Sequence, residues 1–298
     1  GAGKSALVEH IKSALEECDP IYVLEGCPIR EEPLHLIPRS LRDEFAETYG
    51  IKIEGDLCPI CRHTLLEDYG GDFTKFPITE ASFSVRGRKG VGVVPPMDPN
   101  TQDTSLLIGS EDISKLDLYP EDDPRVLSLN GAFNVGNRGI VEFVEVFKNE
   151  IEFLHTMITA TQEKSVPSPG KQAMIYFDGV ILAHCNEAEW NQFKSEHTNE
   201  AILDRIVRVN IPYCLEVDQE VKIYKKLIDR SDFDSHIAPH TLQVAAMFSI
   251  LTRLKPSNKV DPLTKMKIYN GEEIVEKGLI KKVDIRDLRE ETEDEGMT

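Results

Sequence analysis

The chain has 298 residues, long enough for a sizeable core in one large domain or two smaller ones, and its apolar content of 40% excludes a disordered protein. Its net charge of −18, from 52 acidic and 34 basic residues, argues against nucleic acid or an anionic membrane as the main partner, and no apolar run is long enough for a membrane span. Six cysteines without a secretion signal fit a reducing cytoplasm better than a disulfide framework.

The chain opens on the end of a phosphate-binding motif, G-x-x-x-x-G-K-[ST], at Gly1-Ala2-Gly3-Lys4-Ser5. In this motif backbone N–H groups near the glycine surround a phosphate, the lysine reaches the β and γ oxygens, and the serine holds Mg²⁺. Residues 6–17 have helical propensity and apolar spacing, and a helix amino terminus adds its dipole to an anion site. The alternative is a flexible leader that contains these letters by chance.

The first half of the chain has few regular elements. We expect a buried strand at residues 21–24, a loop or single turn at 34–37, and a helix at 41–49 that stops at Gly50. Residues 51–125 are irregular and rich in glycine, proline and aspartate, with a basic patch at 85–90, and are expected to be a functional insertion.

The second half is more regular. The predicted strands are 139–145, 179–183 and 206–211, with a hairpin at 165–176. The predicted helices are 149–163, 187–194, 199–204, 221–230, 238–253 and 260–267. Strands that alternate with helices, followed by helices alone, predict an α/β domain over residues 1–212 and a small all-α domain over residues 213–298.

Two polar residues follow consecutive predicted strands. Glu145 ends the first of these, where a P-loop enzyme needs a carboxylate to polarise the attacking water, although a surface glutamate is the alternative. Val144 stands where an aspartate is expected, and Glu142 is the weaker candidate because it points to the other face of the strand from Glu145. Asn186 follows the second strand and either contacts the γ-phosphate or caps the next helix.

Three arginines are candidates for neutralising phosphate charge. Arg205 lies between a predicted helix and a predicted strand, where it can project toward the nucleotide of a neighbouring subunit, and Arg208 lies three residues on. The alternative for both is a salt bridge with Asp204 or another acid. Arg253, in the helical domain, is placed to fold over the γ-phosphate of its own subunit.

Cysteines with the spacing of a zinc knuckle occur at Cys58-Pro59-Ile60-Cys61. A second pair of ligands is needed, and Cys27 and His35 are the plausible ones, with His63 also near. Plain reduced cysteines are an equal alternative, and a redox pair is a weaker one because the strand-then-helix setting of a thioredoxin is lacking. No kinase catalytic loop, G-x-S-x-G elbow or H-E-x-x-H helix is present.

Taken in order, these segments resemble PrkA, a bacterial and archaeal family described as serine protein kinases. The matching segments are GAGKS at 1–5, CP at 27–28, EPLHLIP at 32–38, LIGSED at 107–112, NGAFN at 130–134, NRG at 137–139, EFVEVFK at 142–148, TATQE at 159–163, HCNE at 184–187, DR at 204–205, VNIPYCL at 209–215 and LTRL at 251–254. The likeness covers essentially the whole chain.

The resemblance implies an AAA+ ATPase module, a three-layer αβα domain with a parallel sheet and a small helical lid. On that likeness the nucleotide-binding residues are Gly1, Ala2, Gly3, Lys4, Ser5 and Ala6, Glu145 is the Walker B glutamate, Asn186 is sensor 1, Arg205 is the arginine finger acting in trans within a ring, and Arg253 is sensor 2. The family's kinase-like region lies further toward the carboxyl terminus, so we interpret the chain as an internal segment of a longer protein that lacks the first half and the strand of its P-loop.

The function predicted from all of this is ATP binding and hydrolysis with Mg²⁺, coupled to a protein partner or an attached kinase-like domain, in a cytoplasmic homo-oligomer that binds neither nucleic acid nor membrane. The alternatives are a protein serine kinase in its own right and a non-hydrolysing ATP-sensing switch. An ATP-dependent protease is a weaker alternative, because no set of residues that would activate a nucleophile is evident.

Overall fold

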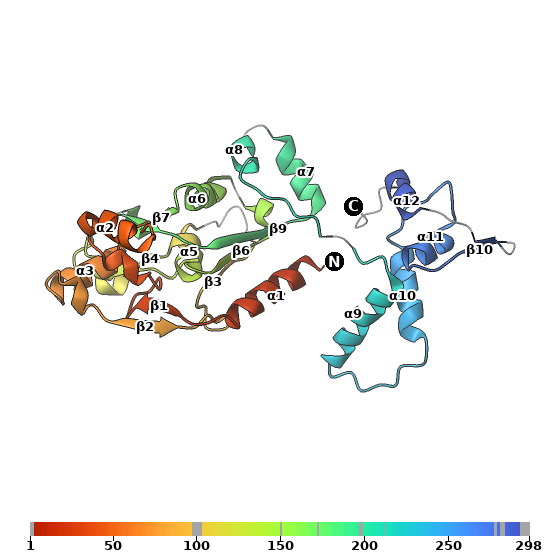
Figure 1. Cartoon of the computed structure of the whole chain (residues 1–298), viewed down its shortest axis with the longest axis horizontal. Helices are drawn as coiled ribbons and strands as arrows, with labels where there is room; N and C mark the ends of the chain where they lie inside the picture. The colour runs from red at the N-terminus through yellow and green to blue at the C-terminus, as the bar shows by residue number, and fades with distance from the viewer. Residues whose placement is uncertain are drawn as a thin grey trace. The chain divides into compact units, whose positions relative to one another are not determined.

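The structure is a computed structural model that describes most of the chain. The described residues are 3–96, 103–149, 151–171, 173–196, 199–211, 213–276, 279–280 and 284–292. The chain divides into two compact units, one of residues 5–206 and one of residues 207–298 together with 1–4, and Figure 1 colours it from its first residue to its last. The predicted domain boundary, Pro212, lies outside the described residues.

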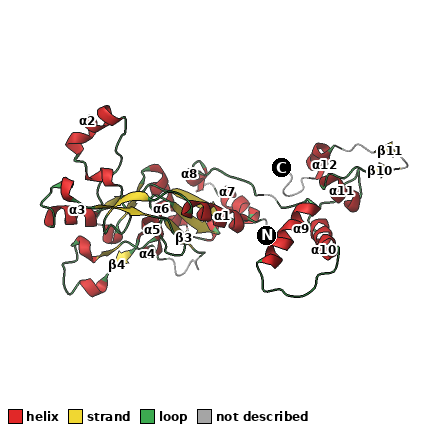
Figure 2. Ribbon diagram, turned by 60° about the horizontal axis from the view of Figure 1, so that its bottom comes forward, coloured by secondary structure: helices red, strands yellow, loops and turns green. Residues whose placement is uncertain are grey.

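A three-stranded parallel sheet lies at the centre of the larger unit. Its order is β3-β6-β9, with β3 at Val91–Val94, β6 at Ile140–Val144 and β9 at Val180–His184. Residues 140–143 of the middle strand are all buried, because a parallel sheet is covered on both faces. Figure 2 shows the strands in yellow among the helices in red. The strands predicted at 139–145 and 179–183 are therefore confirmed.

Helix α1 (Lys4–Glu16) confirms the helix predicted after the opening motif. Its buried residues are Val8 and Lys12, whereas Leu7 and Ile11 are 44% and 39% exposed. The buried side of this helix therefore combines an apolar residue with a charged one, and the charged one matters for the site.

Several further α-helices belong to the larger unit. The described ones between residues 105 and 203 are α4 (Ser105–Ile108), α5 (Ala132–Gly136), α6 (Ile151–Gln162), α7 (Glu187–Ser195) and α8 (Glu200–Leu203). Helix α5 lies very close to β3, since a Cβ on Gly92 would be 2.1 Å from the carbonyl oxygen of Ala132. Below this contact the rings of Phe133 and Phe143 lie 5.9 Å apart, centroid to centroid, in the core. The predicted helices between residues 149 and 204 are confirmed, with ends that differ by a few residues.

Small elements surround the sheet. The antiparallel pairs are β1 (Ile21–Leu24) with β2 (Ile78–Ala81), β4 (Ser110–Glu111) with β5 (Leu127–Ser128), and β7 (Ser165–Pro167) with β8 (Met174–Tyr176). The other described helices of the larger unit are α2 (Arg39–Tyr49), α3 (Pro59–Glu67) and the 3₁₀ helices η1 (Pro33–Leu36), η2 (Phe73–Lys75), η4 (Ile113–Lys115), η5 (Pro124–Val126), η6 (Val146–Lys148) and η7 (Pro169–Lys171). The helix that stops at Gly50 and the hairpin at 165–176 are confirmed, and so is the strand at 21–24, although it is only partly buried because Tyr22 is 61% exposed.

The segment predicted as an irregular insertion, residues 51–125, contains regular elements, namely α3, β2, β3, α4 and β4, and one predicted strand is absent. Residues 91–94, assigned to an irregular insertion, form β3 because β6 supplies parallel hydrogen bonds that a four-residue pattern does not reveal. Residues 206–211, predicted as a strand, are not one, and Val207 and Val209 are 89% and 71% exposed. A strand needs a neighbour for its backbone hydrogen bonds, and no strand of the described residues pairs with this segment.

The smaller unit is helical, as predicted, with one short ladder added. Its elements are α9 (Val217–Asp229), α10 (Thr241–Leu251), α11 (Pro262–Tyr269), α12 (Ile285–Thr292), and the antiparallel pair β10 (Val275–Glu276) and β11 (Leu279–Ile280). Its core includes Ala246, Ile250, Met266 and Leu288, which are fully buried. Of the helices that the structure describes, none combines the length and the apolar character that crossing a membrane requires.

Candidate functional site

Polar residues follow two neighbouring strands at the same edge of the sheet. Glu145 comes directly after β6, and Asn186 comes two residues after β9. The strands are parallel, and Val144 lies opposite His184 in the register. The two side chains therefore start from the carboxyl edge of the sheet, the edge at which open α/β sheets bind their ligands.

Two contacts fix the direction of α1 relative to this edge. Lys12 Nζ donates to Glu142 Oε2 at 2.8 Å, in the middle of β6. One turn further, Glu16 Oε1 accepts from the backbone N–H of Val85 at 2.6 Å, in the segment that leads into β3 at the amino end of the sheet. The amino end of α1 is therefore directed toward the carboxyl edge (Figure 1).

The lengths of the two elements agree with this direction. Ser5 precedes Lys12 by seven helical residues, a rise of roughly 10 Å at about 1.5 Å per residue. Glu145 follows Glu142 by three residues, also roughly 10 Å at about 3.3 Å per residue of strand. Ser5 and Glu145 thus come to a similar level beyond the Lys12–Glu142 pair.

The opening motif is described from Gly3 onward. Gly3 has a φ of 80°, the left-handed region that favours glycine. Lys4 begins α1, and Ser5 and Ala6 are exposed in its first turn, where backbone N–H groups lack helical partners. Gly1 and Ala2, which the sequence predicts as part of the same loop, lie outside the described residues.

A buried charge cluster joins α1 to the sheet, and sequence reasoning missed it. Lys12 and Glu142 are 3% and 4% exposed, and His184 Nε2 lies 3.3 Å from Glu142 Oε1. Burial lowers the pKa of Lys12, but hydrogen bonds to Glu142 and Glu9 outweigh it and the pKa is raised overall. Glu142 is therefore engaged with Lys12, and a lysine at a helical position gives no signal in the sequence that it will be buried.

Glu145 has an unusual backbone. Its φ and ψ are 50° and 53°, a left-handed conformation that non-glycine residues rarely adopt. Its carboxylate pairs with Lys148 of η6, and its side chain is 40% exposed. Hydrogen bonding to this carboxylate raises the pKa of Lys148. Strained backbone of this kind clusters at functional sites, which makes Glu145 a functional candidate on conformation as well as on sequence.

Asn186 is the N-cap of α7, the structural alternative that the sequence left open. Its Oδ1 accepts from the backbone N–H of Glu189 at 2.8 Å, and Glu189 Oε2 accepts from the backbone N–H of Asn186 at 3.4 Å. This reciprocal pair is a capping box. The cap uses the oxygen of the amide and not its NH₂ group, so capping and a contact through Nδ2 are compatible.

The predicted arginines lie in different units. Arg205 is exposed after α8 and donates to Gln162 Oε1 at 2.7 Å and to the carbonyl oxygen of Ala201, instead of pairing with Asp204. Arg253 belongs to the smaller unit, where Nη2 donates to Glu220 Oε1 at 2.9 Å. Hydrogen bonding to Glu220 raises the pKa of Arg253. Arg208 is exposed, in the segment after α8.

Three of the four predicted metal ligands come together. The ligand atoms of Cys27, Cys58, Cys61 and Glu31 all lie within 4.8 Å of one another. The fourth member is Glu31 rather than the predicted His35, because His35 Nδ1 lies 3.1 Å from Glu31 Oε1 and does not join the sulfur atoms. Hydrogen bonds from the other two thiols lower the pKa of Cys27 to about 3. Burial raises the pKa of Glu31.

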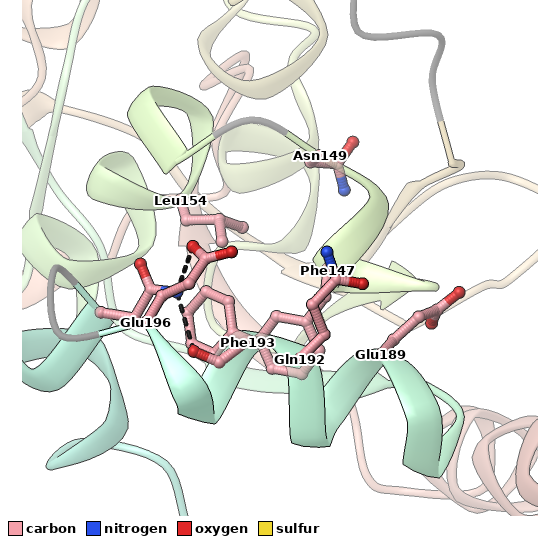
Figure 3. A pocket seen from close by; sticks show the side chains of 8 residues that line it. Phe147, Asn149, Leu154, Glu189, Gln192, Phe193 and Glu196 are labelled. Atoms are coloured by element: carbon pink, nitrogen blue, oxygen red, sulfur yellow. Dashed lines mark hydrogen bonds between the residues drawn. The ribbon is translucent and has the colours of Figure 1, made fainter.

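A pocket of about 230 Å³ lies between η6, α6 and α7 (Figure 3). The rings of Phe147 and Phe193 stack across it with centroids 4.1 Å apart. The described residues that line it are Phe147, Asn149, Leu154, Glu189, Gln192, Phe193, Glu196 and Asn199. None of the predicted nucleotide-site residues is among them, so this pocket is not evidence for the nucleotide site.

The family model for the PrkA AAA domain matches residues 1–261. The chain belongs to the PrkA AAA domain family. The α/β AAA fold predicted from the PrkA resemblance is therefore confirmed, and the parallel sheet with covering helices agrees with it.

Two curated relatives agree with the family. The chain is 44% identical over 305 residues to "ATP-dependent protease PrkA" of Bacillus subtilis (strain 168), covering 99% of this chain and 48% of that protein. It is 39% identical over 282 residues to "Serine/threonine kinase YeaG" of Escherichia coli (strain K12), covering 92% of this chain and 44% of that protein. The chain thus spans about half the length of these relatives.

Among solved structures, the chain resembles NtrX from Brucella abortus. The TM-score is 0.41 at 15% identity, over 55% of this chain and 36% of the NtrX chain.

Proposed function

We propose that this chain is the ATP-binding and ATP-hydrolysing AAA+ module of a PrkA-type protein. The observation that carries the proposal is the convergence of three features on the carboxyl edge of the sheet, namely the amino end of α1, Glu145 and Asn186. A helix amino terminus that follows a glycine and begins with a lysine is suited to bind phosphate, and this edge is where α/β sheets bind nucleotides. The nucleotide state would be passed to a protein partner or to an attached kinase-like region.

We assign phosphate binding to the opening residues of the chain. Backbone N–H groups from Gly3 to Ala6 and the ammonium of Lys4 would surround the β and γ phosphates, with Gly1 and Ala2 completing the loop. The exposed hydroxyl of Ser5 would hold Mg²⁺. Val144 offers no ligand at the position of the usual aspartate, and Glu142 is paired with Lys12. Water molecules would therefore complete the metal's coordination beside Ser5.

We assign hydrolysis to the residues that follow β6 and β9. Glu145 accepts a proton from a water molecule while the water oxygen bonds to the γ-phosphorus, and the bond to the bridging oxygen breaks so that ADP leaves with the electron pair. Lys148 holds the carboxylate in the present structure, so the ion pair must loosen for Glu145 to reach the water. Asn186 would orient that water through Nδ2.

The two arginines would serve the nucleotides of different subunits. Arg205 is exposed and oriented by Gln162, as an arginine that serves a neighbouring subunit must be, and we propose that copies of the chain form a ring in which it acts in trans. Arg253 would act on its own subunit's γ-phosphate, for which its guanidinium must exchange Glu220 for phosphate.

The test is phosphate release by a chain extended at its amino end so that the whole G-x-x-x-x-G-K-S motif is present. We expect Lys4→Ala to abolish ATP binding. We expect Arg205→Ala to keep ATP binding and to lose turnover, and mixing it with a Lys4→Ala chain to restore part of the turnover if the arginine acts in trans. Undiminished phosphate release from either single variant would refute its role. Binding without turnover in the unmodified extended chain would point to a nucleotide-sensing switch.

A second candidate function is phosphoryl transfer to a protein serine. The observation that favours it is the name of the Escherichia coli relative, a serine/threonine kinase about twice as long as this chain. Transfer of the γ-phosphate of labelled ATP to a protein by residues 1–298 alone would support it, and label that appears only as free phosphate would support the ATPase.

A further inference from the structure

The cysteine cluster has the dimensions of a tetrahedral metal site. Its four ligand atoms, from Cys27, Glu31, Cys58 and Cys61, lie within 4.8 Å of one another. Around a zinc ion with Zn–S bonds of about 2.3 Å and a Zn–O bond of about 2.0 Å, such atoms are separated by roughly 3 to 4 Å. A contraction of about 1 Å or less, which side-chain rotation provides, would bring the set to coordination distance.

Backbone geometry presents the sulfur atoms inward. Cys58 is the N-cap of α3, and its sulfur accepts from the backbone N–H of Cys61 at 3.4 Å. The sulfur of Cys27 accepts from the backbone N–H of Glu31, also at 3.4 Å. Two separate turns thus each aim an N–H group at a sulfur, and such donors stabilise the thiolate form that binds metals.

Glu31 has an oxygen left for a metal. Its Oε1 accepts from the backbone N–H of Cys58 at 2.7 Å and lies 3.1 Å from His35 Nδ1. Its Oε2 faces the sulfur of Cys27 at 4.0 Å. The carboxyl group is 1% exposed, and no lysine or arginine of the described residues pairs with it. A buried carboxylate in this setting is stabilised by a cation.

We propose that Cys27, Cys58, Cys61 and Glu31 bind one structural Zn²⁺ ion. Glu31 Oε2 is the fourth ligand, and His35 orients Glu31 through Nδ1, as hydrogen-bonding partners orient metal ligands elsewhere. The assignment differs from a Cys₃His site in that the histidine lies outside the coordination shell. It is independent of the ATPase proposal, since its residues lie away from the carboxyl edge.

Burial argues against a redox role for the same cysteines. Cys58 and Cys61 are 1% and 2% exposed, so an incoming thiol cannot reach either sulfur in line. A thioredoxin-type pair also needs one exposed sulfur and has no use for a third cysteine and a carboxylate. Four donors closed off from solvent are the arrangement of a structural metal site.

The site would fasten the early part of the chain to the central sheet. Between the ligands Cys27 and Glu31, the carbonyl oxygen of Ile29 accepts from Asn137 Nδ2 at 3.1 Å. Asn137 Oδ1 in turn accepts from the backbone N–H of Asp178 at 2.9 Å, just before β9. The metal would thereby hold the turn that supports the amino ends of β6 and β9, and its loss would destabilise residues 5–206.

The first test measures the metal itself, in protein produced with zinc present and purified without chelators. We expect about one zinc per chain by elemental analysis, and an X-ray absorption spectrum with three sulfur atoms at about 2.3 Å and one lighter atom at about 2.0 Å. Zinc far below one per chain, or a Cys58–Cys61 disulfide in freshly purified protein, would overturn the proposal.

Matched variants identify the ligands. Serine substitution of Cys27, Cys58 or Cys61 should abolish zinc binding, whereas Cys18→Ser, Cys185→Ser and Cys214→Ser should retain it, since these three cysteines lie outside the cluster. Equal loss in both sets would contradict the assignment. Because a ligand variant can fail to fold, wild-type protein is also loaded with Co²⁺ in place of zinc. Sulfur-to-cobalt charge-transfer bands support the site, and their absence overturns it.

Two further variants separate Glu31 from His35. Glu31→Gln should weaken zinc binding at least about tenfold, whereas the neighbouring Glu32→Gln should leave it unchanged. His35→Gln should keep three sulfur atoms and one oxygen in the X-ray absorption spectrum while it lowers affinity. If the lighter-atom signal at about 2.0 Å disappears in His35→Gln but remains in Glu31→Gln, the histidine is the ligand and the assignment to Glu31 is wrong.

Discussion

The buried pair of Lys12 and Glu142 makes a quantitative prediction about stability. Glu142→Gln removes the carboxylate charge that neutralises Lys12, a residue that is 3% exposed and whose Nζ lies 2.8 Å from Glu142 Oε2. Breaking one side of a buried ion pair costs about 3–5 kcal/mol. The remaining neighbour, Glu9, lies 2.5 Å from Lys12 but its side chain is 62% exposed, so it compensates only in part. We therefore expect a loss of about 3 kcal/mol, near the lower end of that range.

The assay is urea unfolding followed by tryptophan fluorescence. The sequence contains one tryptophan, Trp190, which lies in α7 of the larger unit and therefore reports that unit alone. For a unit of this size, a loss of about 3 kcal/mol corresponds to a Tm lower by roughly 6–12 °C.

Two controls separate the buried pair from a general charge effect. Glu9→Gln removes an exposed partner of the same lysine and should cost less than about 1 kcal/mol. The double variant Lys12→Met with Glu142→Met removes both charges and should be more stable than Glu142→Gln alone. A Glu142→Gln protein that unfolds with the Glu9→Gln midpoint, or a double variant that is no better than the single one, would refute the reasoning.

Three further predictions concern single residues. Because Glu145 has a φ of 50°, Glu145→Gly should be more stable than Glu145→Ala by about 1 kcal/mol in urea unfolding, and equal stability would mean that the left-handed turn is not kept in solution. Folding raises the pKa of Lys12 above 10.5, so the stability that it contributes is present below pH 10.5 and is lost as the pH rises through the folded value. Wild type should therefore lose stability in that alkaline range while Lys12→Met does not, and parallel curves would argue against the pair. Asn186→Asp keeps the cap and removes the NH₂ group, so it should leave stability within about 0.5 kcal/mol and reduce ATP turnover, and unchanged turnover would leave Asn186 as a helix cap alone.

Much of the larger unit could be predicted because its elements have local signals. The helix after the opening motif, the strand that ends before Glu145 and the cap at Asn186 each depend on spacing or on one polar residue at a boundary. The segment at 91–94 has only four residues next to Gly90 and Pro95, and its identity as a strand depends on a partner almost fifty residues later. Local patterns do not carry that information.

The site residues that the sequence did not predict also depend on contacts between distant parts of the chain. Cys58 and Cys61 were evident from their spacing, but Glu31 becomes a candidate ligand only when the turn after Cys27 closes and brings its carboxylate to the sulfur atoms. His35 is chemically a good ligand, yet it contacts Glu31 instead. Lys12 is one of several lysines on helices, and its burial is decided by a carboxylate that lies 130 residues away in the sequence.

The most direct measurement of the proposed chemistry compares ATP binding with ATP turnover in Glu145→Gln, in the extended chain with the complete phosphate-binding motif. The amide keeps the size of the side chain but cannot accept a proton from water. We predict ATP affinity within about threefold of wild type and phosphate release reduced at least about a hundredfold. Phosphate release at the wild-type rate, with ATP bound equally well, would contradict the assignment of the carboxyl edge as a hydrolytic site.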